Sequence, residues 1–453
     1  MVNMNTYSAI ILVGLLAVTS LPAASARYLV GNRISPTLDG GNDHSVENPP
    51  ALDNESEPPF DIKLHSTDHH LPKSLIAAQF ARDPHAHRDR LEMIQTGELG
   101  LTGIRYSPTS FSAESDDNDM YSNVYGEFCV FNSQLNKADP SYYPTLKDIL
   151  SESPHCSEHR YTIPLGDAIE AIKTSKDMKT LPLSGMLFHQ GFAGAGIVSN
   201  ALTAFDSTLV ISEHSALQDA LSACDAIHNR SKSDDCSIAK QQRLVRDIVT
   251  LFSRTSDDSV KNLFLKLNSS SAVYLHTLRA LYPSAKWTFS YRNAEETLSK
   301  NMQRKRNITC VKAKRNPSAA LSEKSTEYNL ELEYLSHHEI CALHLSTLFE
   351  AAMREHESSS TGLLISYSDI VSSLGNVIVE EVLPHLGLQG ELNSNSEVRD
   401  KIIQILSTRS NSRSAGRTKQ WDATQESDLE ISDEVSNAVI GFIGDMVGGP
   451  SAR

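Results

Sequence analysis

Short apolar runs alternate with amphipathic stretches over residues 124–390 of the chain. The apolar runs predict strands, because each is short and bounded by turn residues, at 124–131, 185–190, 208–213, 263–267, 286–292 and 363–367. The stretches with helical periodicity predict helices at 164–173, 215–228, 237–254, 272–281, 294–304 and 327–356, with Asn293 as a helix cap. Strands that alternate with helices are typical of an α/β fold, in which helices cover both faces of a parallel β-sheet.

The first hundred residues have a different pattern. Residues 9–18 are almost entirely apolar, and residues 24–26 have the small-x-small form of a signal-peptidase site. This predicts a cleaved signal peptide within residues 1–26, with a retained membrane anchor as the alternative. Residues 27–100 combine acidic residues, scattered histidines and proline or glycine pairs without periodicity, which predicts a flexible stem and no metal ligand set. We expect residues 101–180 to be an extension that packs on the core, and residues 181–450 to form the α/β domain.

The composition of the chain restricts the compartments in which the protein could be located and the classes of molecule that it could bind. The net charge is −15, which argues against a non-specific nucleic-acid binder. The six cysteines fall as three local couples, and we expect the couples to form disulfides: Cys129–Cys156, Cys224–Cys236 and Cys310–Cys341. Four N-glycosylation sequons begin at Asn54, Asn229, Asn268 and Asn307. The sequons add little, because a chain this rich in Asn, Ser and Thr contains about as many by chance; the leader and the paired cysteines predict a protein of the secretory pathway, located in the Golgi lumen or secreted.

A glycine-rich turn between residues 190 and 196 carries the strongest chemical signal. It follows an apolar strand and opens a helix that ends near Leu202, and this arrangement favours an anion site. Gly191 and Gly196 have the spacing of a nucleotide-triphosphate loop, but the Lys and Ser/Thr that should follow are replaced by Ile197 and Val198. This argues against a kinase or ATPase. A dinucleotide-binding fold remains an alternative, because Gly194 and Gly196 nearly match its motif and Glu213 stands where a ribose-binding acid belongs.

Five blocks in order give a third interpretation. They are Phe188-His-Gln-Gly-Phe-Ala-Gly-Ala-Gly196, Ile211-Ser-Glu213, Phe264-Leu-Lys266, Tyr282-Pro-Ser-Ala-Lys-Trp-Thr-Phe-Ser-Tyr-Arg292 and Ile365-Ser-Tyr-Ser-Asp-Ile370, with Leu383-Pro-His-Leu-Gly-Leu388 after them. Over residues 183–390 the chain resembles the sulfotransferase superfamily. The resemblance implies a P-loop NTPase-like fold and 3′-phosphoadenylyl sulfate as the donor, without a metal. The implied acceptor is a hydroxyl group, such as that of a carbohydrate, and the membrane is a partner only if the N-terminal segment is retained.

The resemblance also implies roles for individual residues. The 5′-phosphosulfate would be bound by Gly191, Gly194, Ala195, Gly196 and Ile197, and the 3′-phosphate by Arg292, Ser299 and Lys300. Glu213 would be the catalytic base, with His189 and His214 as reserves, and Lys266 would stabilise the departing phosphate.

The chain departs from the family pattern at the loop. Gly194 stands where the family has Arg or Lys, and Ile197 and Val198 stand where it has hydroxyl side chains. Ser299 is seven residues after Arg292 instead of eight, and Lys300 occupies the eighth position. Each charge-assisted hydrogen bond that is lost would weaken donor binding by about 1.5–3 kcal/mol. A catalytically degenerate binding protein is therefore the second interpretation of the chain.

Overall fold

The computed structural model describes residues 84–111, 120–132, 135–140, 142–176, 178–225, 236–303, 309–373, 375–406 and 431–443. The expected leader at residues 1–26 lies outside these ranges, as do the sequons at Asn54, Asn229 and Asn307. Helix α2 (Pro84–Gln95) packs against α6 (Leu165–Thr174). Residues 84–100 were predicted to be the last part of a flexible stem. They are folded instead, because α2 packs against α6. Within the described ranges, none of the helices combines the length and the apolar character that crossing a membrane requires.

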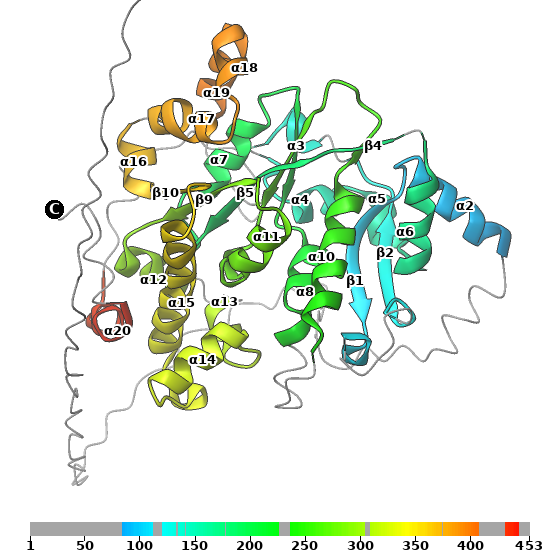
Figure 1. Ribbon diagram of the computed structural model, residues 1–453. Coiled ribbons are helices and arrows are strands. Elements are labelled where there is room, and N and C mark those ends of the chain that lie inside the picture. The colour runs from blue at the N-terminus through cyan, green and yellow to red at the C-terminus, as the bar shows by residue number, and fades with distance from the viewer. Residues whose placement is uncertain are drawn as a thin grey trace, which may run out of the picture. The chain divides into compact units, whose positions relative to one another are not determined.

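Five parallel strands form the main sheet, in the spatial order β10-β9-β5-β8-β6 (Figure 1). Their bounds are Leu183–His189 for β5, Thr208–Ser212 for β6, Asn262–Lys266 for β8, Lys286–Tyr291 for β9 and Gly362–Ser366 for β10. Each matches an expected apolar run, and every pair is parallel. The predicted parallel sheet is confirmed.

Helices cover both faces of this sheet, and the side chains of β5 show how. Met186 and Phe188 point into one hydrophobic core, while Leu187 between them points into a second core on the opposite face. The first core contains residues of α8 (Ser215–Leu221), α10 (Ile238–Phe252), α11 (Leu275–Leu281) and α15 (His337–Glu357). The second contains residues of α7 (Ala195–Leu202), α16 (Tyr367–Ser372), η5 (Ile378–Val382), α17 (Leu383–His385), α18 (Gln389–Ser394) and α19 (Ser396–Leu406). The α/β class with two covered faces is confirmed.

The strand order tests the alternative that the chain has a dinucleotide-binding fold. A dinucleotide fold places its second strand directly beside the first. Here β8 separates β5 from β6, the first and second strands of the sheet. The dinucleotide alternative is therefore wrong for this chain, because the acid after β6 is one strand too far from the glycine turn. The connections change direction at β5, and ligands of open α/β sheets bind where this happens, beyond the carboxyl ends of the strands.

The region before β5 forms a separate antiparallel sheet in the order β1-β2-β3. Its strands are Gly100–Tyr106, Val124–Cys129 and Tyr161–Pro164, and side chains of all three belong to the first core. Short elements complete this region: η1 (Pro108–Phe111), α3 (Leu135–Ala138), α4 (Leu146–Ser151), α5 (Pro154–Glu158) and β4 (Lys179–Thr180), which pairs with β7 (Arg254–Thr255). Only β2 was expected from the sequence.

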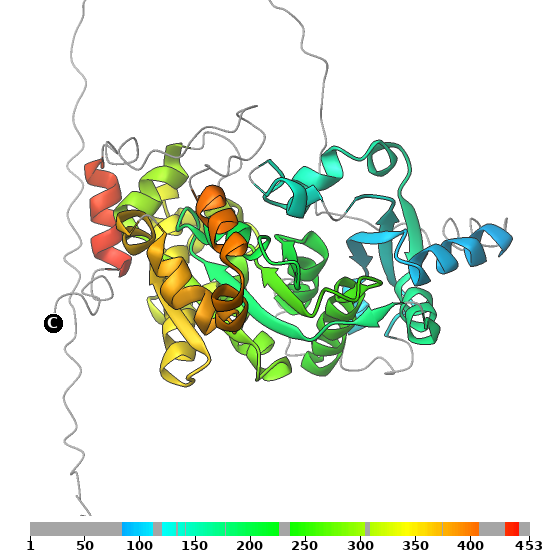
Figure 2. The same cartoon turned by 90° about the horizontal axis from the view of Figure 1, so that it is seen from above.

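The C-terminal half differs from expectation in one long helix. The sequence predicts a helix over 327–356, but α15 begins only at His337, because Ser336 and Glu339 form a capping box there. The preceding residues form α14 (Ala319–Glu327) and η4 (Leu332–Tyr334). Helices α12 (Ala294–Gln303) and α15 both contact α20 (Asp433–Ile443), the red helix in Figure 2. The remaining elements are η3 (Ser269–Tyr274) and α13 (Thr309–Ala313).

All three expected disulfides are present. The Cα atoms are 5.2 Å apart in Cys129–Cys156, 5.6 Å in Cys224–Cys236 and 4.9 Å in Cys310–Cys341. These separations lie below the limit of about 7 Å for an unstrained bridge. Disulfides of this kind are typical of proteins that fold in an oxidising compartment.

Candidate functional site

The glycine turn connects β5 to α7 and has an unusual backbone. Gly191, Phe192 and Gly194 all have positive φ, at 96°, 52° and 83°. A Cβ atom built on Gly191 meets nothing within 4 Å, whereas one on Gly194 would lie 2.9 Å from Ile370 Cδ1 and 3.1 Å from Tyr367 Cδ2. Gly194 is thus required by its φ and by the packing of α16. Residue 194 therefore has no room for a side chain in this chain.

The N–H groups of the turn have different partners. The N–H of Gly191 donates to His189 Nδ1 at 3.0 Å, and that of Ile197 donates to the Gly194 carbonyl at 2.9 Å. Neither N–H group is directed at a ligand. Gly191 and Ile197, which were both expected to bind the donor, instead shape the turn and close the first turn of α7, respectively. Ala195 and Gly196 begin α7, where helix geometry provides no internal partner for an N–H group. These two N–H groups are the best placed to bind an anion.

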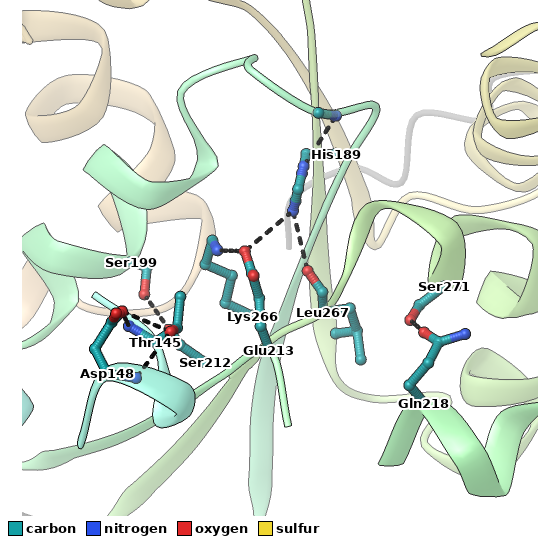
Figure 3. A network of polar contacts seen from close by, with 11 residues as sticks. Thr145, Asp148, His189, Ser199, Ser212, Glu213, Gln218, Lys266, Leu267 and Ser271 are labelled. Carbon is teal, nitrogen blue, oxygen red and sulfur yellow. Dashed lines mark hydrogen bonds and ion pairs between the residues drawn. The ribbon is translucent and has the colours of Figure 1, made fainter. Parts of the chain in front are cut away.

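Three ionisable side chains meet at the carboxyl ends of β6 and β8. The carboxylate of Glu213 lies between the ammonium group of Lys266 and the ring of His189 (Figure 3). Lys266 forms a direct ion pair with Glu213 Oε1, and His189 Nε2 is 3.9 Å from the same oxygen. The backbone fixes the pair, because the N–H of Glu213 donates to the Lys266 carbonyl at 2.7 Å and Glu213 itself has a φ of 51°. The Lys266 side chain is 6% exposed and that of Glu213 31% exposed, so an incoming molecule reaches the carboxylate first.

The two reserve histidines are held in the neutral form. Each Nδ1 accepts a backbone N–H, from Gly191 at His189 and from Ala216 at His214. The proton is therefore on Nε2, which donates to the carbonyl of Leu267 at 3.1 Å and of Leu101 at 2.9 Å, respectively. Burial lowers the pKa of both rings to about 4. Because both nitrogens of each ring are engaged, neither histidine is free to act as the base.

Arg292 follows β9 and lies at the start of α12. Its Nε donates to Glu296 Oε2 at 2.5 Å, and its guanidinium carbon lies 4.4 Å from the centre of the Tyr367 ring. Asn293 caps the helix, with its side-chain oxygen accepting the N–H groups of Glu295 and Glu296. The expected cap is confirmed. The Arg292 side chain, which is 5% exposed, therefore contacts both a carboxylate and an aromatic ring.

Arg292 lies beside the glycine turn, as expected from the sequence. Gln190 Nε2, at the start of the turn, donates to the Arg292 carbonyl at 2.5 Å. The ring of Tyr367 contacts the guanidinium on one side and approaches Gly194 on the other. The predicted proximity of Arg292 to the turn is confirmed.

The two residues expected to support Arg292 differ in their placement. Ser299 is 5% exposed, and its Oγ is enclosed without a hydrogen-bond partner among the residues that the structure describes. Contact between Ser299 and a ligand would require α12 to move. Lys300 is half-buried on the same helix, one position further along. The one-residue offset noted in the sequence thus turns the serine inward.

Three contacts of the site were not expected from the sequence. Glu296 follows Arg292 by four residues, a spacing that brings side chains together on a helix and could have suggested the pair. Gln190 gives no such signal, because its reach to Arg292 depends on the conformation of the turn. Ser199 links α7 to β6 through a 3.0 Å hydrogen bond to Ser212 (Figure 3).

No family model matches the chain, and no curated protein matches it. Solved structures do match. Several of them are sulfotransferases. Sulfotransferase STF9 from Mycobacterium avium is 9% identical, with a TM-score of 0.37, over 79% of this chain and 95% of that chain. Sulfotransferase STF1 from Mycobacterium tuberculosis H37Rv is 14% identical, with a TM-score of 0.31, over 58% and 77%. The sulfotransferase domain of the Synechococcus PCC 7002 olefin synthase is 11% identical, with a TM-score of 0.29, over 58% and 96%. We derive no residue role from these sulfotransferases.

Proposed function

We propose that the protein is a sulfotransferase that moves a sulfuryl group from 3′-phosphoadenylyl sulfate to a hydroxyl group of a glycan or another acceptor in the secretory pathway. One observation carries the proposal. The glycine turn, the Glu213–Lys266 pair and Arg292 meet at the carboxyl edge of one parallel sheet, where its connections change direction. The sulfotransferase-like order of the sequence blocks supports the same activity.

The donor would bind at two places. The N–H groups of Ala195 and Gly196 face a 5′-phosphosulfate, with the partial positive charge of the α7 N-terminus behind them. Arg292 would bind the 3′-phosphate, assisted by Lys300 from the same helix. The nucleotide then bridges β5 and β9, two adjacent strands of the sheet.

The reaction assigns one task to each member of the ion pair. Glu213 accepts the proton of the acceptor hydroxyl as its oxygen forms a bond to sulfur. The bond between sulfur and the bridging phosphate oxygen breaks at the same time, and the departing phosphate gains negative charge. Lys266 is buried and positively charged beside that point, so it stabilises this charge. No step requires a metal.

Binding of the product nucleotide tests the proposal. We expect adenosine 3′,5′-bisphosphate to bind the wild-type protein in isothermal titration calorimetry. Arg292→Ala should weaken binding by about 1.5–3 kcal/mol, because it removes a charged phosphate contact. Arg399→Ala is the matched control, since Arg399 on α19 forms an exposed ion pair with Glu380 of η5, outside the proposed site. Wild-type protein without measurable affinity for the nucleotide would refute the proposal.

A catalytically degenerate binding protein is the second candidate function. The observation that favours it is the packing at Gly194, which leaves no room for the cation that the family carries in the loop. Its signature would be a wild-type protein that shows no measurable affinity for adenosine 3′,5′-bisphosphate and transfers no sulfuryl group from radiolabelled donor to a mixture of glycan acceptors. Transfer to any acceptor in the mixture would exclude it.

A further inference from the structure

The glycine turn needs external support to keep its shape. Three of its residues have positive φ, and one of these is Phe192, whose side chain disfavours that region. A backbone of this kind persists only where the surroundings fix it. The two residues at the entrance of the turn, His189 and Gln190, are 8% and 6% exposed and supply such contacts.

His189 ties the turn to β8. Its Nδ1 accepts the N–H of Gly191 at 3.0 Å, and its Nε2 donates to the carbonyl of Leu267 at 3.1 Å. Leu267 directly follows Lys266. One ring therefore fixes the first glycine of the turn relative to the strand end that carries the ammonium group.

Gln190 ties the turn to β9 on the other side. Its Nε2 donates to the carbonyl of Arg292 at 2.5 Å and to Thr297 Oγ1 at 2.9 Å, inside α12. One side chain therefore fixes the turn to the residue that carries the guanidinium and to the helix that follows it. The two braces point in opposite directions, because β8 and β9 flank β5 in the sheet.

We infer that His189 and Gln190 are positioning residues: His189 fixes the turn against β8 and Gln190 ties it to Arg292, and together they set the separation between the turn that holds the 5′-phosphosulfate and the Arg292 site that holds the 3′-phosphate. This inference rests on the proposed function. A ligand with both phosphates senses that separation, whereas a ligand with one phosphate does not. Neither residue contacts the ligand in this proposal, and each acts through the backbone of its partner.

The test compares three nucleotides on the full chain: adenosine 3′,5′-bisphosphate, adenosine 5′-monophosphate and adenosine 3′-monophosphate. Gln190→Met keeps the length of the side chain but loses both donors. We expect it to weaken binding of the bisphosphate about 10- to 50-fold, since two buried hydrogen bonds are removed. Binding of either monophosphate should change less than about 3-fold. Arg292→Ala provides the contrast, because it should weaken the bisphosphate and the 3′-monophosphate but not the 5′-monophosphate.

Two further variants keep the test decisive. His189→Asn can still accept the N–H of Gly191 but is too short to reach Leu267, so it should weaken the bisphosphate about 3- to 10-fold. It carries the test if Gln190→Met does not fold, which its thermal denaturation will show. Thr297→Val leaves the bond from Gln190 to the Arg292 carbonyl, so less than about a 3-fold change is expected.

Two results would overturn the inference. In the first, Gln190→Met and His189→Asn bind the bisphosphate as the wild type does. In the second, they weaken all three nucleotides equally, which would indicate a structural role alone. Failure of the wild type to bind the bisphosphate is a different result, because it would overturn the proposed function itself.

Discussion

Replacing Gly194 by alanine tests whether α16 closes the donor loop to side chains. The φ of Gly194 is 83°, and the added Cβ would lie 2.9 Å from Ile370 Cδ1. A left-handed alanine costs about 1–2 kcal/mol, while the less flexible unfolded chain returns about 0.4–1 kcal/mol. Overpacking against Ile370 and Tyr367 adds about 1–3 kcal/mol. We expect Gly194→Ala to lower the free energy of unfolding by about 1–4.5 kcal/mol in total.

A matched glycine separates the two contributions. Gly387 has a φ of 88°, and a Cβ there meets nothing within 4 Å. Gly387→Ala should therefore carry only the backbone cost, about 0–1.5 kcal/mol. The difference between the two variants, about 1–3 kcal/mol, measures the contact with α16. Urea unfolding with the disulfides intact gives both values.

A double-mutant cycle identifies the atom responsible. Ile370→Val deletes Cδ1, so Gly194→Ala should be less destabilising in the Ile370→Val background than in the wild type, with a coupling energy of about 0.5–1 kcal/mol. Rescue should be partial, because the contact with Tyr367 Cδ2 at 3.1 Å remains. Equal costs for Gly194→Ala and Gly387→Ala, or additive costs in the cycle, would refute the reasoning.

Three other measurements follow from the structure. Glu213→Gln should lower turnover by about 10²–10⁴-fold in a radiolabelled sulfate-transfer assay. Its affinity for adenosine 3′,5′-bisphosphate should stay within about 3-fold of the wild type. Undiminished turnover would show that Glu213 is not the base. Burial lowers the pKa of His189, His214 and His344 to about 4, so their stabilising contribution is complete above pH 6.5 and is lost as the pH falls toward 4. We expect about 2 kcal/mol less stability per histidine at pH 5, and a urea midpoint that is unchanged between pH 7 and pH 5 would contradict this. Burial, with the nearby charge of Glu127, raises the pKa of Asp219 to about 7. The contribution of Asp219 to folding stability is therefore complete below pH 3.8 and is lost as the pH rises to about 7. Asp219→Asn should stabilise the protein by about 1–3 kcal/mol at pH 8 and not at pH 3.5, and equal effects at both pH values would count against the raised pKa.

Local signals explain which parts of the fold could be predicted from the sequence. The strands of the main sheet are buried on both faces, so each reads as a continuous apolar run, and Pro283 and Gly191 separate them from their neighbours. The disulfides and the Asn293 cap also join residues close in sequence. Strands β1 and β3 were missed because their pairing with β2 depends on tertiary contacts. The true start of α15 could have been found, since Ser336 and Glu339 have the spacing of a capping box.

The candidate site could also be predicted only in part: the residue types at the strand ends could be predicted, and the directions of N–H groups and side chains could not. Residue types at strand ends identified Glu213, Lys266 and Arg292, because the carboxyl ends of parallel strands meet at one edge. Which N–H groups and hydroxyls face a ligand could not be read from the sequence. The turn directs the N–H of Gly191 to His189, and the helical phase directs Ser299 inward. Both outcomes depend on side-chain packing around the turn and α12.

The absence of a basic side chain at residue 194 fits the position of Tyr367. The ring lies against the guanidinium of Arg292 at 4.4 Å and within 3.1 Å of where a Cβ of residue 194 would be. A basic side chain at 194 would therefore have to displace the ring on which Arg292 rests. Positive charge on this side of the turn is supplied by Arg292, held by Tyr367 and Glu296. Gly194 and the contact of Arg292 with Tyr367 are consequently parts of one packing arrangement, and a basic side chain at residue 194 would disturb both.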